Sequence, residues 1–135
     1  MKFVIAILAL AFAPSIVAAQ NSSGNTGDVA SHCVDIQIEQ SQYDDTEYFN
    51  IMNTCNGDIF VIYCGDVVGS NNVCGGGNNS VYYTHSKVLR SGTSSEAAIR
   101  GNGMFVWGAC TGRISFGNDG HFEDYPDGSY RCLPR

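Results

Sequence analysis

The sequence predicts a small all-β domain, an antiparallel sandwich or barrel of about seven or eight short strands stabilised by disulfides. Three observations support this fold class. Short β-branched and aromatic runs alternate with turns rich in Gly, Asn and Pro, no segment shows the period of an amphipathic helix, and the 135-residue chain contains six cysteines. An even number of cysteines in a short exported chain is typical of a disulfide framework.

The N-terminus has the pattern of a secretory signal peptide. Lys2 precedes the apolar run 3–13, Pro14 interrupts it, and the small residues 17–19 offer a cleavage site before Gln20. We expect a signal peptide over 1–19, a flexible polar leader over 20–30 and a single β domain over 31–135, in a secreted or periplasmic protein. The apolar run is short for a membrane-spanning helix, so we expect no membrane insertion after cleavage; an uncleaved anchor is the alternative.

The segment 48–64 predicts a central hairpin. Two apolar runs flank Asn56-Gly57, the dipeptide best suited to a two-residue type I′ turn. In that hairpin Ile51 would face Ile62, and both faces would be mostly apolar, so we expect other elements to cover each face.

The six cysteines allow fifteen sets of three disulfides, among which the sequence alone cannot choose. In the predicted hairpin, Cys55 and Cys64 would lie about 20 Å apart, at about 3.3 Å per residue, which disfavours their pairing. We expect the bridges Cys33–Cys55, Cys64–Cys74 and Cys110–Cys132. No Cys-x-x-Cys pair is present, so a zinc site is not favoured and no cofactor is expected.

The other elements follow from local pattern. Ser94 resembles a helix N-cap and Ala97 and Ala98 favour a helix, so 94–100 is expected to form a helical turn or two. Residues 65–80 are expected to form a long loop rich in Gly and Asn. Further strands are expected at 33–39, at 81–90 (with Tyr83, His85 and Leu89 on one face), at 104–110, and in the shorter segments 113–116, 121–122 and 129–133.

One short segment resembles a known family. Residues 49–55, FNIMNTC, form an alternating apolar strand that runs into Asn-x-Cys. This segment resembles the first strand of thaumatin-like proteins. The resemblance implies a disulfide-tied β-sandwich and no particular function.

Charge is unevenly distributed. Removing Lys2 leaves six basic and thirteen acidic residues, a formal charge of −7, and 20–86 contains eight carboxylates and no Lys or Arg. Such a chain repels phosphate backbones, so nucleic acid and anionic membranes are not expected partners. The acidity favours solubility; a cationic partner is the alternative.

Catalytic candidates are few. His85 and His121 could act as acid and base, Glu96 could assist them, and Arg100 or Arg113 could stabilise developing charge. No catalytic motif links these residues. A small secreted hydrolase that uses the two histidines is therefore an alternative to the favoured function.

Residues 117–128 are the weak candidates for a metal site. Calcium binds six to eight oxygen ligands. The spacing differs from that of the twelve-residue calcium loop, so turns are favoured over a site. The carboxylates concerned are Asp119, Glu123, Asp124 and Asp127.

Tyrosines near turns suggest a binding surface, because they combine flat apolar area with a polar tip. We expect a secreted non-enzymatic binding protein that recognises a glycan or an extracellular protein through the 65–80 and 117–128 loops; a secreted inhibitor or toxin-like protein is a further alternative. The candidate binding residues are Tyr82, Tyr83, Asp124, Tyr125 and Asp127.

Asn21 and Asn78 begin glycosylation sequons.

Overall fold

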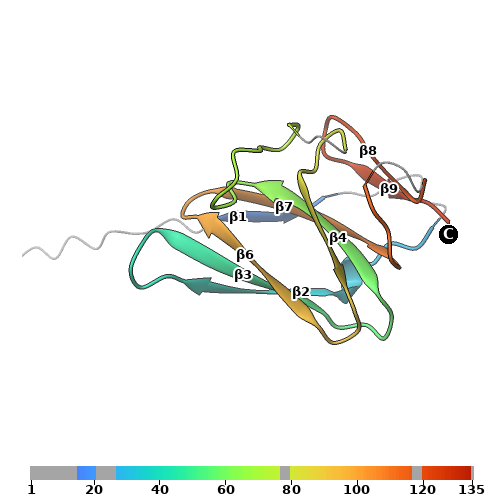
Figure 1. Cartoon of the computed structure of the whole chain (residues 1–135), viewed down its shortest axis with the longest axis horizontal. Coiled ribbons are helices and arrows are strands. Elements are labelled where there is room, and N and C mark those ends of the chain that lie inside the picture. The colour runs from blue at the N-terminus through green and yellow to red at the C-terminus, as the bar shows by residue number, and fades with distance from the viewer. Residues whose placement is uncertain (1–14, 21–26, 77–79, 117–119, 135) are drawn as a thin grey trace, which may run out of the picture.

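The computed structural model describes residues 15–20, 27–76, 80–116 and 120–134. These residues form nine strands and one short 3-10 helix (Figure 1). In chain order the elements are β1 (Ile16–Ala19), η1 (Ser31–Cys33), β2 (Val34–Gln40), β3 (Thr46–Asn53), β4 (Ile59–Gly65), β5 (His85–Leu89), β6 (Ser94–Arg100), β7 (Met104–Thr111), β8 (Phe122–Asp124) and β9 (Tyr130–Cys132).

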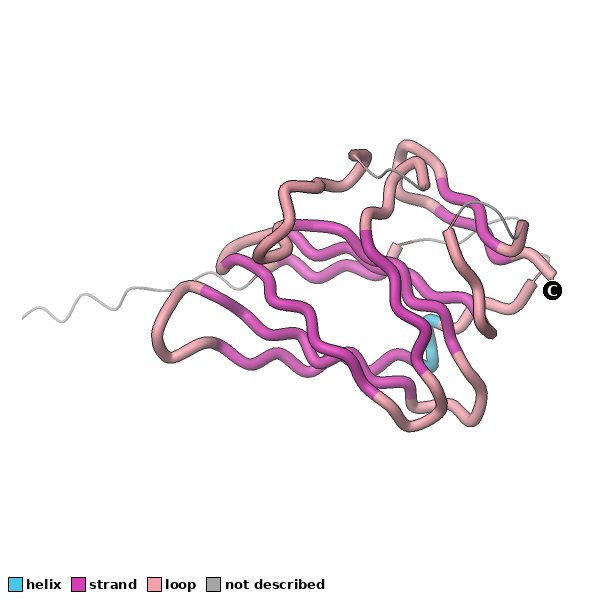
Figure 2. Tube along the Cα trace, viewed as in Figure 1, coloured by secondary structure: helices cyan, strands magenta, loops and turns pink. Residues whose placement is uncertain are grey.

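The strands form three layers, with a four-stranded sheet in the middle (Figures 1 and 2). Its strand order is β1-β7-β4-β5; a three-stranded sheet, β2-β3-β6, covers one face, and the β8–β9 hairpin covers part of the other. The strand pairs of the described chain are antiparallel, except that β1 runs parallel to β7. The predicted disulfide-stabilised all-β fold is confirmed.

Strand β4 has every residue buried because it packs against both outer layers. Val61 and Tyr63 point into the core shared with β2-β3-β6, which we call the inner core. Phe60 and Ile62 point into the core beneath β8–β9, which we call the outer core. In the outer core, Gly108 gives the Tyr130 ring room to approach β7, since a Cβ there would lie 2.4 Å from that ring.

The predicted β3–β4 hairpin is wrong. The two strands belong to different sheets, and both edges of β3 are occupied, one by β2 and the other by β6. Neither Asn56 nor Gly57 has the positive φ that a type I′ turn requires. Residues 54–58 instead carry the chain from one sheet to the other.

Asn53 holds this crossover in place. Its buried side-chain amide donates to the carbonyls of Gly57 (2.7 Å) and Leu89 (3.0 Å), and its side-chain oxygen accepts from the Cys55 N–H (3.0 Å). One asparagine thereby joins the end of β3 to the start of β4 and to the end of β5.

All three predicted disulfides are confirmed. Cys33–Cys55 ties the start of β2 to the crossover, Cys64–Cys74 ties the end of β4 to the following loop, and Cys110–Cys132 joins β7 to β9. Cys33–Cys55 lies at the end of the β2–β3 ladder, whereas the other two bridges join parts of the chain that no strand ladder connects. Three disulfides fit an extracellular or other oxidising compartment.

The helix predicted for 94–100 is also wrong, because this segment is strand β6. It pairs with β3, and its residues alternate so that Ala97 and Ile99 are buried in the inner core. The open edge of β3 outweighs the weak local helix preference. The short strand predicted at 113–116 does not form either.

The strand predicted at 81–90 begins only at His85. Tyr83 packs into the outer core and Leu89 into the inner core, so the two side chains do not share a face as predicted.

Part of the predicted flexible leader is fixed in the structure. Ala30 is fully buried and donates to the carbonyl of Ala109, while the carbonyl of Asp28 accepts from Thr111 N–H (2.8 Å). Residues 28–30 thus lie along the far half of β7; residues 21–26 are outside the described part of the chain. No helix of the described residues has the length and apolarity needed to cross a membrane.

Replacing Asn53 with Ala tests the crossover. We expect Asn53→Ala to lower the free energy of unfolding by about 2–3 kcal/mol, because it leaves buried backbone groups without partners. Urea unfolding of the oxidised protein measures this loss. Asn50→Ala, on the side of β3 away from the inner core, should change stability by less than about 0.5 kcal/mol; equal effects of the two changes would refute the role of Asn53.

Candidate binding surface

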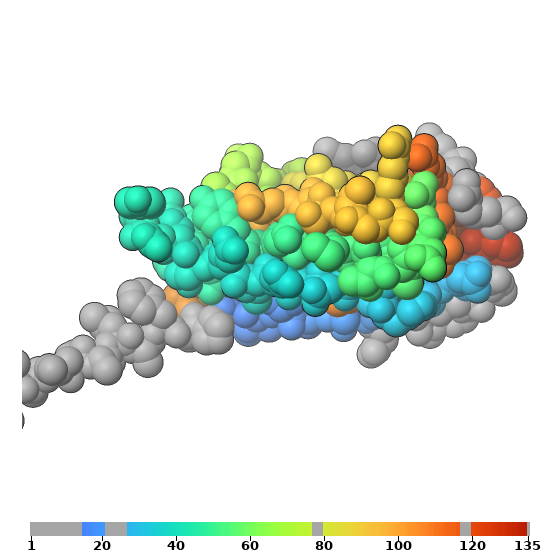
Figure 3. All heavy atoms as spheres, turned by 90° about the horizontal axis from the view of Figure 1, so that it is seen from below, coloured from blue at the N-terminus to red at the C-terminus, as the bar shows by residue number. Residues whose placement is uncertain are grey.

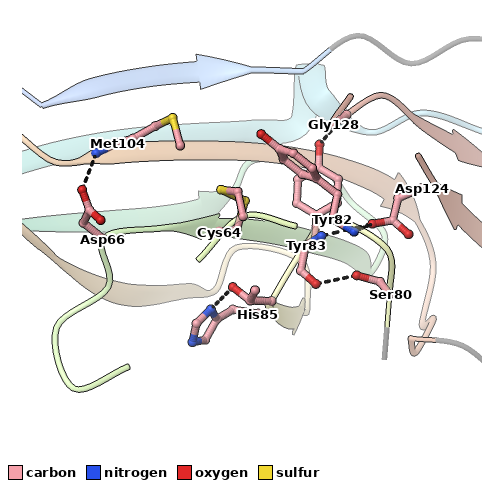
Figure 4. The surroundings of a disulfide bond; sticks show 11 residues. Cys64, Asp66, Ser80, Tyr82, Tyr83, His85, Met104, Asp124 and Gly128 are labelled. Carbon is pink, nitrogen blue, oxygen red and sulfur yellow. Dashed lines mark hydrogen bonds between the residues drawn. A yellow bond between two sulfur atoms is a disulfide. The ribbon is translucent and has the colours of Figure 1, made fainter. Parts of the chain in front are cut away.

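Asp124, at the end of β8, organises the region in which most candidate residues lie. Its nearly buried carboxylate accepts three backbone N–H groups, from Val81 (2.9 Å), Tyr82 (2.6 Å) and Tyr83 (3.1 Å). Figure 4 shows Asp124 directed at this stretch of backbone. The predicted binding and metal candidate therefore holds the segment before β5 against the β8–β9 hairpin.

Tyr83 is fully buried and does not present its ring to solvent. Its hydroxyl donates to the carbonyl of Gly128 (2.6 Å; Figure 4), and the Ser80 hydroxyl donates to the backbone carbonyl of Tyr83. Burial raises the pKa of the Tyr83 hydroxyl well above its usual range, and the nearby Tyr130 contributes to the same shift. Tyr83 is a core residue of this region.

The exposed neighbours of Asp124 form a polar and aromatic surface. Tyr125 is 38% exposed, and its hydroxyl donates to a Glu123 oxygen (3.3 Å) that also pairs with Arg131 (2.6 Å). Half-buried Tyr82 lies against Gly128, where an added Cβ would be 2.9 Å from its ring. We call this the hairpin surface and define it by Tyr82, Glu123, Tyr125, Asp127 and Arg131.

The described acidic residues near the hairpin turn already have partners. Asp127 accepts from the N–H and the hydroxyl of Ser129, and these bonds lower the pKa of its carboxyl. Glu123 pairs with Arg131, and Asp124 faces backbone amides. The weak metal candidate Asp119 lies outside the described residues.

One group in the described chain has metal-ligand spacing: His32, Cys33 and Cys55, whose ligand atoms lie within 4.8 Å of one another. The two sulfurs form a disulfide in the folded chain. The oxidised protein therefore offers a single imidazole at this position.

The structure does not bring His85 and His121 together. His85 stacks on Tyr63 of the inner core, with 5.2 Å between ring centroids, whereas His121 precedes Phe122 of the outer core. The two histidines are thus associated with opposite faces of the central sheet. The Nδ1 atom of His121 lies 2.6 Å from the carbonyl of Pro134.

The remaining catalytic candidates are dispersed. Glu96 is exposed on β6, and Arg113 pairs with Asp58 (2.6 Å) on the crossover. Arg100, at the end of β6, donates to the carbonyl of Val67 (3.2 Å). The two arginine contacts support the fold in separate places.

Two features were not singled out from the sequence. Tyr43 is 96% exposed at the tip of the β2–β3 turn, beside a hollow of about 530 Å³ lined by residues 40–45. Glu47 on β3 is a buried carboxylate in an alternating strand, where it occupies an inward position beside Phe49. Strand alternation through β3 could have identified Glu47, and the polar residues that surround Tyr43 in 40–47 could have indicated its exposure.

No protein-family model, curated protein or solved structure matches this chain. The likeness of residues 49–55 to thaumatin-like proteins is thus confined to that segment.

Replacing Asp124 with Asn tests its anchoring role. We expect Asp124→Asn to lower the free energy of unfolding by about 2–3 kcal/mol, because the new NH2 group faces backbone N–H donors. Thermal and urea unfolding measure the loss. Asp127 is exposed, so Asp127→Asn should lower the free energy of unfolding by clearly less. A larger loss for Asp127→Asn than for Asp124→Asn would contradict the anchoring role of Asp124.

The His85 imidazole should titrate below its usual pKa of about 6.5. Burial lowers its pKa, and the neighbouring Lys87 lowers it further. As pH falls below about 6.5, the unfolded chain takes up the proton first, so this residue contributes a loss of stability on acidification. An NMR titration of the His85 ring measures the midpoint; Lys87→Gln should raise it, and a wild-type midpoint at or above about 6.5 would contradict the expectation.

Proposed function

We propose that this chain is an exported, non-catalytic binding protein that recognises a glycan through the hairpin surface. The observation that carries the proposal is the exposed ring of Tyr125 beside the Glu123–Arg131 pair, on a hairpin held by Asp124. A flat aromatic face suits the apolar face of a sugar ring, while carboxylate and guanidinium groups suit its hydroxyls. An extracellular protein is the alternative ligand class.

Export is part of the proposal. The signal-peptide pattern of residues 1–19 supports cleavage before Gln20. Three disulfides agree with folding in an oxidising compartment.

Rigidity favours binding by this surface. Asp124 joins β8 to the segment before β5, Tyr83 joins that segment to the β8–β9 turn, and Cys110–Cys132 joins β9 to the central sheet. A ligand would therefore meet side chains that are already positioned, which reduces the entropy lost on binding. The hydrolase alternative has no comparable support, because its two histidines are on opposite faces of the central sheet.

The test is a glycan array probed with the oxidised, secreted protein, in arms with calcium and with chelator. We expect binding to a defined set of glycans that Tyr125→Ala weakens at least about tenfold, which corresponds to about 1.4 kcal/mol for one lost aromatic contact. Chelator should have no effect, because the described carboxylates of the hairpin surface already have protein partners.

Tyr43→Ala is the matched control. It removes an exposed tyrosine from the β2–β3 turn, away from the β8–β9 hairpin (Figure 1), and should leave glycan binding unchanged. A blank array would exclude the glycan proposal and direct attention to extracellular proteins. Binding that Tyr125→Ala and Tyr43→Ala affect equally would place the site elsewhere.

A further inference from the structure

Strand β1 fills one edge of the central sheet. Residues 16–19 pair in parallel with residues 104–107 of β7. The Ile16 N–H donates to the carbonyl of Gly103 (3.1 Å), and the Gln20 N–H donates to the carbonyl of Trp107 (2.9 Å). In Figure 3 this segment is the dark blue strip along the lower side of the molecule, where Ile16 is 68% exposed.

The inward side of β1 closes the space between two layers. Val17 packs against the inner core, to which Phe105 and Trp107 of β7 and Ile36 of β2 also belong. Ile38, further along β2, is already 49% exposed. Without β1, the edge of β7 and these apolar side chains would border an open groove.

A buried carboxylate lies at one end of this groove. Glu47 is 6% exposed; its Oε1 accepts the Ser15 N–H at 3.4 Å, and its Oε2 has no hydrogen-bond partner. A carboxylate that is buried and only partly hydrogen-bonded is unfavourable, and a cation next to it would offset that cost. The position of the Ser15 nitrogen is where a ligand could supply such a cation.

The residues that fill the groove are the last residues of the predicted signal peptide. Cleavage before Gln20 removes all of β1, and it also removes Ser15 from Glu47. The covering segment 28–30 lies along the other half of β7, at 109–111, and would remain. Residues 20–26, QNSSGNT, contain no apolar side chain that could replace Val17.

We propose that the groove vacated by residues 15–19 binds the free amino-terminal strand of an extracellular polypeptide. This inference rests on the export and cleavage in the proposed function, and it concerns a site separate from the hairpin surface. The ligand strand adds in parallel to β7, and its terminal ammonium pairs with Glu47. Addition of a strand to an open sheet edge and capture of a terminal amine are both recurrent modes of peptide recognition.

The strand that occupies the groove in the full chain defines the ligand's pattern. The third residue, equivalent to Val17, carries a small β-branched side chain into the inner core. The second and fourth residues, equivalent to Ile16 and Ala18, supply N–H groups to β7, because alternate N–H groups of a strand face the same side. Once β1 is removed, residues 104–107 of β7 form an unpaired sheet edge, and such an edge favours pairing with an added strand.

The experiment begins with expression of the full chain in a secreting host, followed by intact-mass and N-terminal analysis of the secreted protein. Binding of three synthetic hexapeptides is then measured by NMR titration. The first is SIVAAQ-amide with a free amine; the second is its N-acetylated form; the third is SIVPAQ-amide, which lacks the N–H equivalent to that of Ala18. Glu47→Gln is the test variant and Glu39→Gln, exposed on β2, is its matched control.

We expect a secreted chain that begins at Gln20 and binds the free-amine peptide at least about tenfold more tightly than the acetylated peptide. Glu47→Gln should abolish this difference and Glu39→Gln should preserve it, while SIVPAQ-amide should bind at least about tenfold more weakly than SIVAAQ-amide. The NMR chemical-shift changes caused by SIVAAQ-amide should be confined to β7, β2 and the surroundings of Glu47.

Three results would overturn the inference. A chain that begins at Gln20 but binds none of the peptides has no such groove, although export stands. A secreted chain that retains residues 15–19 contradicts both the cleavage and the open groove. Equal affinity for the free-amine and acetylated peptides in the wild-type protein excludes amine recognition by Glu47, whether or not the Glu47→Gln variant folds.

Discussion

The structure depends on one constraint: β4 is apolar on both faces, so both faces must be covered. Val61 and Tyr63 require one layer, and Phe60 and Ile62 require another. A two-layer sandwich would expose one of these pairs to water, at a cost of about 1.5–3 kcal/mol for each large side chain. The three-layer arrangement follows, with β2-β3-β6 on one side and the β8–β9 hairpin on the other.

The crossover after β3 makes this arrangement possible. A tight hairpin would keep β3 and β4 in one sheet, whereas the 54–58 connection lets the chain change layers. Asn53 and the Cys33–Cys55 bridge both fix that connection, Asn53 through the Gly57 carbonyl and the bridge through Cys55. The remaining disulfides tie β4 to its following loop and β7 to β9.

Sequence patterns predicted the class of fold and most strands, because these depend on local alternation. The three expected disulfides also form, although the sequence alone does not choose among the fifteen sets and the hairpin that disfavoured Cys55–Cys64 is absent. The errors came where tertiary pairing overrides local preference. Asn56-Gly57 favours a hairpin, but the edges of β3 are taken by β2 and β6. Residues 94–100 favour a helix weakly, but they complete the sheet beside β3.

The candidate site was predicted in part. The segment around 123–127 does carry an exposed tyrosine and charged groups, yet Asp124 and Tyr83 are structural, since their polar atoms are used to hold backbone. Turn patterns mark where polar residues gather, but they do not show which atoms face solvent. The pairing of residues 16–19 with β7 could not be predicted from the sequence either, because small apolar residues suit both a cleavage site and an edge strand.

The most direct test of the crossover and of the three-layer arrangement is the set of inter-strand NOEs made by β4 in the oxidised protein. The three-layer arrangement predicts backbone contacts between Val61 and Ala109 on one side and between Val61 and Lys87 on the other, as β7 and β5 flank β4. A backbone contact between Ile51 and Ile62 would instead show a β3–β4 hairpin, and it would contradict both the crossover and the three-layer arrangement.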